Sequence, residues 1–224
     1  MEKRDKTITY TLIAPEVRAL CVSDARLSIL INHYGQLSYS LHTDPTSFFI
    51  ETIVAQMLSS KAADAITARL YDLCGGKLTI DEVLELDVTA FRGIGLSRKK
   101  AEYILGLARI LRSRPCYFEQ LNDMPDEEII KHLTAIHGIG SWSAKMYLIF
   151  VLDRKDVLPH EDGAFQQVYK WLYTTDDTKP SAIRQRCARW WPYSSIAARY
   201  LYRALDEGLM RDLQLSERLS TAGA

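Results

Sequence analysis

Apolar residues recur at steps of three and four along most of the chain, a spacing typical of amphipathic helices. The longest such stretch covers residues 51–73, and Gly75 and Gly76 stop it. A second stretch covers residues 97–112, where Ser97 is well suited to cap the helix N-terminus. We therefore expect one continuous helix over each of these ranges.

Other patterns complete the predicted architecture. Residues 142–152 are apolar on every side, which indicates a central buried helix. A further helix is expected after Asp162, where apolar residues again fall on one side. Residues 7–13 alternate polar and apolar side chains, the pattern of a short strand. In total we expect eight or nine helices and few strands, a mainly all-α fold.

No linker rich in proline or glycine divides the chain. We expect an N-terminal segment at residues 1–45, with the few strands, to pack on a helical core at residues 46–224 in two lobes. The longest apolar run, Met146–Leu152, is far too short to cross a bilayer. The four cysteines lie far apart with no CxxC pair: Cys21, Cys74, Cys116 and Cys187. These features favour a cytoplasmic protein with reduced thiols.

Net charge is zero over 224 residues, but the charges are unevenly distributed. Residues 178–205 carry six basic side chains and no acid, and residues 92–114 carry seven basic side chains and one acid. Such stretches suit a basic face that binds a polyanion. They are equally compatible with ordinary solvated helix faces, and charge alone does not decide between the two.

Gly138-Ile139-Gly140 lies between two predicted helices, at about residues 133–150. A hairpin of this kind exposes the N-terminus of its second helix, where unpaired N–H groups attract anions. Glycines there would let a DNA phosphate approach the backbone, with Ile139 pointing inward as an anchor. The alternative is an ordinary helix–helix turn. For the similar copy at residues 93–95, the two interpretations are equally favoured.

The pattern Leu133-x-x-Ile136-x-Gly138-Ile139-Gly140-x-x-Ser143-Ala144, with Asp162 downstream, resembles the helix–hairpin–helix DNA glycosylases, and most of all their alkylpurine branch, of 3-methyladenine DNA glycosylase II type. Further stretches resemble other motifs of this family in the same order: 53–66, 95–108, 156–165 and 190–205. The resemblance implies a two-lobed helical fold with the active site in the cleft between the lobes.

Asp162 matches the catalytic aspartate of the family. A carboxylate beside the sugar stabilises the positive charge that develops when the base leaves. Asp162 also precedes a predicted helix and would make a good N-cap, and the two roles are compatible. Glu161 is expected to point to solvent. His160 is expected at the surface, and the alternative is a position behind the catalytic residue.

The resemblance implies an aromatic base pocket, in which a flipped base could stack. Its members would be Trp142, Met146, Tyr193 and Gln56. Trp142 occupies the position where relatives that also cut the backbone carry a lysine nucleophile, so the resemblance implies a monofunctional glycosylase. The face of a tryptophan also attracts cationic alkylated purines. The alternative for Trp142 is a core residue at a helix start.

Met57 falls where the family places an apolar wedge that fills the space of the flipped base. Met57 also fits the apolar spacing of residues 51–73, so packing in the core is the rival interpretation. The DNA-contacting set implied by the resemblance is Met57, Ser59, Gly138, Ile139, Gly140, Ser141, Ser143 and Lys145. Backbone carbonyls of Ile136 and Ile139 would hold a structural Na⁺ or K⁺, and no other cofactor is expected.

The expected function is hydrolytic excision of alkylated purines from double-stranded DNA by a monomer. Two alternatives stay open: a bifunctional glycosylase/lyase for oxidised bases, and a non-catalytic DNA-binding protein.

Overall fold

The computed structural model describes residues 7–222, except for the side chain of Ser60. This part of the chain contains thirteen α-helices and two short strands, which confirms the mainly all-α prediction. Several helices are too short to produce a recognisable stripe, and the expectation of eight or nine helices was therefore too low. None of the helices in the described part is both long and apolar enough to span a membrane.

The chain divides into two compact units. The terminal unit combines residues 1–41 with residues 153–224, and the inserted unit is the continuous stretch 42–152. Residues 1–6 of the expected N-terminal segment lie outside the described residues, and most of the rest of it falls in the terminal unit.

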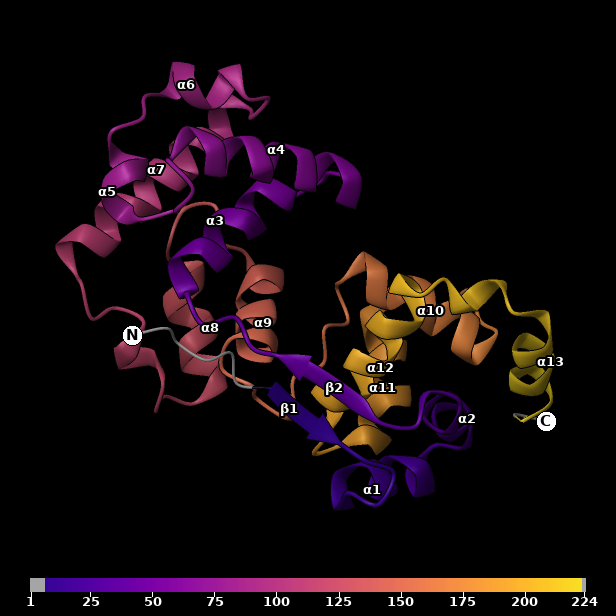
Figure 1. Cartoon of the computed structure of the whole chain (residues 1–224). Helices are drawn as coiled ribbons and strands as arrows, with labels where there is room; N and C mark the ends of the chain where they lie inside the picture. The colour runs from indigo at the N-terminus through magenta and orange to yellow at the C-terminus, as the bar shows by residue number, and fades with distance from the viewer. Residues whose placement is uncertain (1–6, 223–224) are drawn as a thin grey trace. The chain divides into compact units, whose positions relative to one another are not determined.

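The terminal unit is built around α10 (Gly163–Tyr173) and α12 (Ser194–Asp206), whose buried faces carry large aromatic residues such as Phe165, Tyr169 and Tyr200. β1 (Thr7–Tyr10) and β2 (Leu37–Ser40) form an antiparallel pair (Figure 1). In its register Thr7 lies opposite Ser40. The elements of this unit are β1 (Thr7–Tyr10), α1 (Pro15–Ser23), α2 (Ala25–Tyr34), β2 (Leu37–Ser40), α10 (Gly163–Tyr173), α11 (Pro180–Cys187), α12 (Ser194–Asp206) and α13 (Leu213–Thr221).

The inserted unit has an aromatic centre, where the ring of Tyr147 stacks on Phe49 at 5.2 Å between centroids. Its elements are α3 (Pro45–Ala55), α4 (Ser60–Leu73), α5 (Ile80–Leu84), α6 (Val88–Gly93), α7 (Arg98–Ser113), α8 (Asp126–Thr134) and α9 (Ser141–Phe150). The predicted helix at 97–112 is confirmed as α7, and the hydroxyl of Ser97 caps it by accepting the amide of Lys100. The predicted buried helix at 142–152 is confirmed as α9.

The predicted continuous helix at 51–73 is wrong. The chain leaves the helix after Ala55, and a new helix begins at Ser60. Met57 has a φ of 58°, a left-handed conformation that no helix interior contains. Lys100 stabilises the break, because its ammonium group donates to the carbonyls of Val54 at 2.8 Å and Gln56 at 2.6 Å. Those carbonyls would otherwise be unpaired at the helix end.

Candidate functional site

The hairpin between α8 and α9 has the conformation that its sequence predicts. The amide of Ile139 donates to the carbonyl of Ile136 at 3.0 Å, which closes the turn. Ile136 and Ile139 are both buried, so Ile139 points inward as expected. Gly140 is the N-cap residue of α9 and offers no side chain to the first amides of the helix. An anion could therefore approach this helix N-terminus.

The two glycines of the hairpin are present for different reasons. Gly138 has a φ of 94°, and a Cβ atom there would lie 2.4 Å from Cγ of Tyr103. Gly138 is therefore required by the fold itself. Gly140 has an ordinary φ of −96°, and a Cβ atom there would meet nothing within 4 Å. Only at Gly140 does the missing side chain leave open space in front of the backbone.

The loop at residues 56–59 is tied to this hairpin. The side-chain amide of Gln56 donates to the carbonyl of Gly138 at 2.9 Å. The main-chain carbonyl of Gln56 accepts the ammonium group of Lys100, and desolvation lowers the pKa of that lysine. Ser59 then caps α4 by accepting the amide of Ala62. The loop is thus fixed on both sides.

Met57 projects from this fixed loop. Its side chain is fully exposed, so the core-packing interpretation of Met57 is wrong. A left-handed conformation at a residue with a side chain costs about 1–2 kcal/mol, and such strain is found preferentially at functional positions. The loop therefore presents the apolar side chain of Met57 to solvent from a fixed backbone position, as a wedge residue would require.

The other predicted positions of the inserted unit lie on α9. Ser143 and Met146 are buried, Trp142 and Lys145 are partly buried, and Ser141 is exposed. Trp142 is therefore no fully buried core residue. The pocket and DNA-contact roles of these side chains stay predictions.

Asp162 and Tyr193 belong to the terminal unit. Asp162 is the N-cap residue of α10, and its carboxylate accepts the amide of Phe165 at 2.7 Å. Only 8% of the residue is exposed. The predicted capping role is confirmed. Tyr193 is partly buried at the N-cap of α12.

The hydroxyl of Tyr202 is hydrogen-bonded to the same carboxylate. Desolvation of the phenol and the nearby charge of Asp162 raise the pKa of Tyr202 well above its usual range. The phenol therefore keeps its proton and donates it toward the carboxylate. Asp162 is held by a main-chain donor from its own helix and by a side-chain donor from α12.

The rest of α12 fixes the chain segment that leads to Asp162. The hydroxyl of Ser195 accepts the amide of Val157 at 2.9 Å, and Ser194 donates to Asp156 at 2.6 Å. Arg199, one turn further, is buried and lies 3.7 Å from Asp153.

The Arg199 guanidinium also stacks 3.5 Å from the ring centroid of Tyr39. Ser195, Arg199 and Tyr202 follow at steps of four and three, so they share one face of the helix.

His160 is buried, which corrects the expectation of a surface histidine. Its Nε2 atom lies 2.7 Å from an Nη atom of Arg184, and its Nδ1 atom lies 3.1 Å from the carboxylate of Glu161. Arginine can only donate, so Nε2 accepts and the proton is on Nδ1. Glu161 is exposed as expected, although its carboxylate also pairs with the His160 ring.

Sequence reasoning missed Tyr202, Lys100 and Tyr103. The signal for Tyr202 was present, because polar residues at 195, 199 and 202 interrupt an otherwise apolar helix face at helical spacing. No comparable signal marks Lys100 or Tyr103, since both act on main-chain atoms distant in sequence.

No cluster of His, Cys, Asp or Glu suited to a metal ion occurs within residues 7–222. Carbonyl oxygens have two lone pairs, so the carbonyl of Ile136 could take a monovalent cation in addition to the amide of Ile139. The cation site on the carbonyls of Ile136 and Ile139 stays a prediction.

Comparison with known proteins gives the affiliation of the chain. DNA-3-methyladenine glycosylase 1 of Schizosaccharomyces pombe is 30% identical, over 90% of each chain. The crystal structure of DNA-3-methyladenine glycosidase from Bacillus halodurans matches with a TM-score of 0.77 and 33% identity, over 95% of this chain and 99% of that one. A structure of 3-methyladenine DNA glycosylase from S. pombe in complex with abasic DNA matches with a TM-score of 0.75 and 27% identity, over 84% and 96%.

The sequence model described as HhH-GPD superfamily base excision DNA repair protein matches residues 50–193, which include the hairpin, the 56–59 loop and Asp162. With a match over more than half of its length, this chain belongs to the HhH-GPD superfamily of base excision DNA repair proteins.

Proposed function

We propose that the protein is a monofunctional DNA glycosylase that hydrolyses the bond between C1′ and an alkylated purine in double-stranded DNA. The observation that carries the proposal is the carboxylate of Asp162, held by the amide of Phe165 and the hydroxyl of Tyr202. The names of the relatives, DNA-3-methyladenine glycosylases, support the substrate class.

The chemistry suits a fixed carboxylate. Alkylation at N3 or N7 gives the purine a positive charge, so the base leaves with the electrons of the C1′–N bond and becomes neutral. It needs no proton from an acid. Positive charge then develops on the sugar, where the carboxylate of Asp162 stabilises it. Water adds its oxygen to C1′ and releases a proton, which leaves an abasic site.

Trp142 supports hydrolysis rather than backbone cleavage. Lyase chemistry needs an amine that attacks C1′ and forms a Schiff base. The corresponding position of the hairpin carries an indole here. Borohydride treatment during the reaction should accordingly trap no covalent complex with DNA.

The DNA contacts in this proposal come from the inserted unit. The N-terminus of α9 at Gly140 would bind a phosphate, with Ser141, Ser143 and Lys145 nearby in sequence. Met57 would enter the space of the flipped base, and Gln56 fixes the loop that carries it. A Na⁺ or K⁺ ion on the carbonyls of Ile136 and Ile139 would add positive charge beneath the phosphate. The protein would act as a monomer.

Release of free 3-methyladenine and 7-methylguanine from methylated DNA tests the proposal. Asp162→Asn should slow release about a hundredfold or more, the loss typical when a preorganised charge is removed. Asparagine is as good an N-cap as aspartate, so α10 should be preserved. Asp212→Asn makes the same change at the N-cap of α13 and should release bases like the wild type.

Equal release by wild type and Asp162→Asn would overturn the role of Asp162. Release of neither base by the wild type would overturn the alkylpurine substrate. A trapped borohydride adduct would favour the bifunctional alternative.

A further inference from the structure

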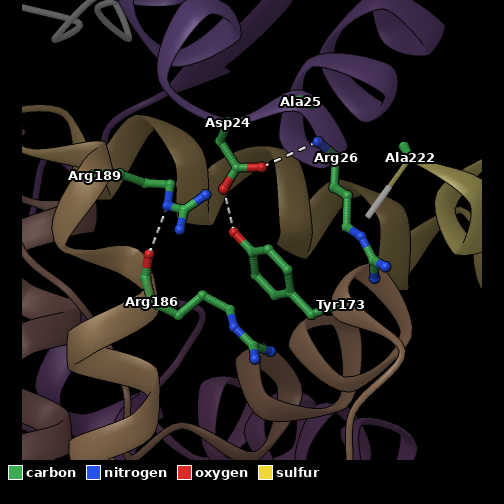
Figure 2. A pocket seen from close by; sticks show the side chains of 7 residues that line it. All are labelled: Asp24, Ala25, Arg26, Tyr173, Arg186, Arg189 and Ala222. Atoms are coloured by element: carbon green, nitrogen blue, oxygen red, sulfur yellow. Dashed lines mark hydrogen bonds between the residues drawn. The ribbon is translucent and has the colours of Figure 1, made fainter. Parts of the chain in front are cut away.

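A pocket of roughly 340 Å³ opens in the terminal unit, beside the start of α2 and the end of α10. Three arginines line it: Arg26, Arg186 and Arg189. Tyr173 lies among them, with Arg186 and Arg189 to one side of its ring and Arg26 to the other (Figure 2). Arg186 and Arg189 come from the basic stretch at residues 178–205, for which the proposed function supplies no role.

Asp24 supplies the one carboxylate among the described residues that line this pocket, and its acceptor sites are already occupied. It is buried and accepts the amides of Arg26 and Leu27 at 3.1 and 3.0 Å, the indole of Trp190 at 3.0 Å and the hydroxyl of Tyr173. These four donors occupy the acceptor sites of one carboxylate. Burial, followed by the charge of Asp24, raises the pKa of Tyr173, so its hydroxyl remains a donor.

Among residues 7–222, no carboxylate is paired with any of the three guanidinium groups. Three positive charges therefore face one negative charge in the pocket, an excess of two. Without a ligand these like charges repel each other, and a bound anion would remove that repulsion.

The arginines are nevertheless held in place. Arg186 lies 5.0 Å from the ring centroid of Tyr173, and Nε of Arg189 donates to the carbonyl of Arg186 at 3.1 Å. Arg26 donates to the carbonyl of Leu172 and the hydroxyl of Thr174, both at 3.2 Å. Each guanidinium has five N–H donors. Hydrogen bonds occupy two of them on Arg26, one on Arg189 and, toward Tyr169, one on Arg186. The remaining donors are preorganised for an acceptor.

We propose that this pocket binds a phosphate group. Arginine presents its donors in a planar fork that matches the oxygens of phosphate, and three such forks suit a tetrahedral anion. The positive excess excludes a metal cation, and the pocket volume is ample for a phosphate with its ester group. The same chemistry has two possible sources: a backbone phosphate of DNA, or a free phosphorylated small molecule such as a nucleotide.

Titration of the ¹⁵N-labelled protein with inorganic pyrophosphate at constant ionic strength, followed by NMR, tests whether the pocket binds phosphate. Saturable shifts of amide resonances are expected at residues 24–27, 173 and 186–189. The double variant Arg26→Gln/Arg189→Gln should weaken binding about tenfold or more. The double variant retains Arg186, whose guanidinium packs on the rings of Tyr169 and Tyr173. A melting curve shows whether the variant is folded. Arg211→Gln, an exposed site that does not line the pocket, is the matched control.

Competition with bound pyrophosphate distinguishes the two sources of the phosphate group. If the pocket takes a DNA phosphate, an undamaged duplex displaces pyrophosphate, and the double variant binds the duplex with a smaller salt dependence. If it takes a free phosphorylated molecule, AMP displaces pyrophosphate and duplex affinity is unchanged. Shifts that do not saturate, or that the double variant reproduces, would overturn the proposal. The test uses no alkylated DNA, so its failure would leave the proposed glycosylase function standing.

Discussion

The hydroxyl of Tyr202, on α12, is hydrogen-bonded to the carboxylate of Asp162, at the N-terminus of α10. The two residues come from different helices, so the orientation of the carboxylate depends on the packing of α12 against α10. A main-chain amide alone would leave the carboxylate less constrained. The pair therefore links tertiary packing to the chemistry we propose.

Replacement of Tyr202 by phenylalanine tests this link. A hydrogen bond to a charged group contributes about 1.5–3 kcal/mol, so excision should slow by about tenfold to a hundredfold. The loss should appear in kcat and leave KM nearly unchanged, because Tyr202 acts on the carboxylate rather than on DNA binding. Tyr200→Phe is the control, because its hydroxyl donates to the carbonyl of Gly35 instead. An unchanged kcat in Tyr202→Phe would contradict the link.

Met57→Ala should separate stability from activity. The side chain is fully exposed, so its removal should change the free energy of unfolding by no more than about 0.5 kcal/mol. Base flipping, followed by the fluorescence of 2-aminopurine opposite or beside the lesion, should decrease together with excision. Met57→Leu retains an apolar wedge and should retain most of both. Unchanged flipping in the alanine variant would exclude the wedge role.

The two hairpin glycines should respond oppositely to alanine. Gly138→Ala combines a positive φ with a clash against Tyr103, so denaturant unfolding should show a loss of about 2–4 kcal/mol. Gly140→Ala has neither problem and should lose at most about 1 kcal/mol. DNA affinity, measured at matched salt, should nevertheless decrease in Gly140→Ala. Full affinity in that variant would mean that no phosphate approaches Gly140.

Stability should decrease above about pH 10. Desolvation raises the pKa of Tyr34, Tyr71 and Tyr200 from 10.0 to about 12 in the folded protein. Between these values the unfolded chain loses phenolic protons that the native state retains, so unfolding becomes more favourable as pH rises. Denaturant midpoints between pH 8 and 11 measure the effect, and Tyr71→Phe should reduce it. A midpoint that stays constant over this range would contradict the raised values.

Helices with a regular stripe and a capping residue could be predicted from the sequence. α7 and α10 begin directly after Ser97 and Asp162, because each side chain accepts an amide of the first turn. Such caps act over three residues and are visible in sequence. The capping role of Asp162 followed from the same logic, and its proposed chemistry from a family resemblance.

The break at residues 56–59 could not be predicted in this way. Apolar spacing continues through Met57 as though the helix did, and the donor that ends α3 is Lys100, 44 positions away from Gln56. Neither the apolar spacing nor a capping residue in the sequence indicates such a contact. The same holds for Gly138, where the conflict is with the ring of Tyr103 on another helix.

The terminal unit is assembled from both ends of the chain, while residues 42–152 form a continuous insertion. During synthesis, the inserted unit can form its own core before residues 153–222, on which residues 7–41 pack, have been made. Tyr202 leaves the ribosome after every other residue of the proposed site. A nascent or truncated chain that ends before α12 would therefore carry the hairpin without a fixed carboxylate: it could occupy DNA and leave the damaged base in place.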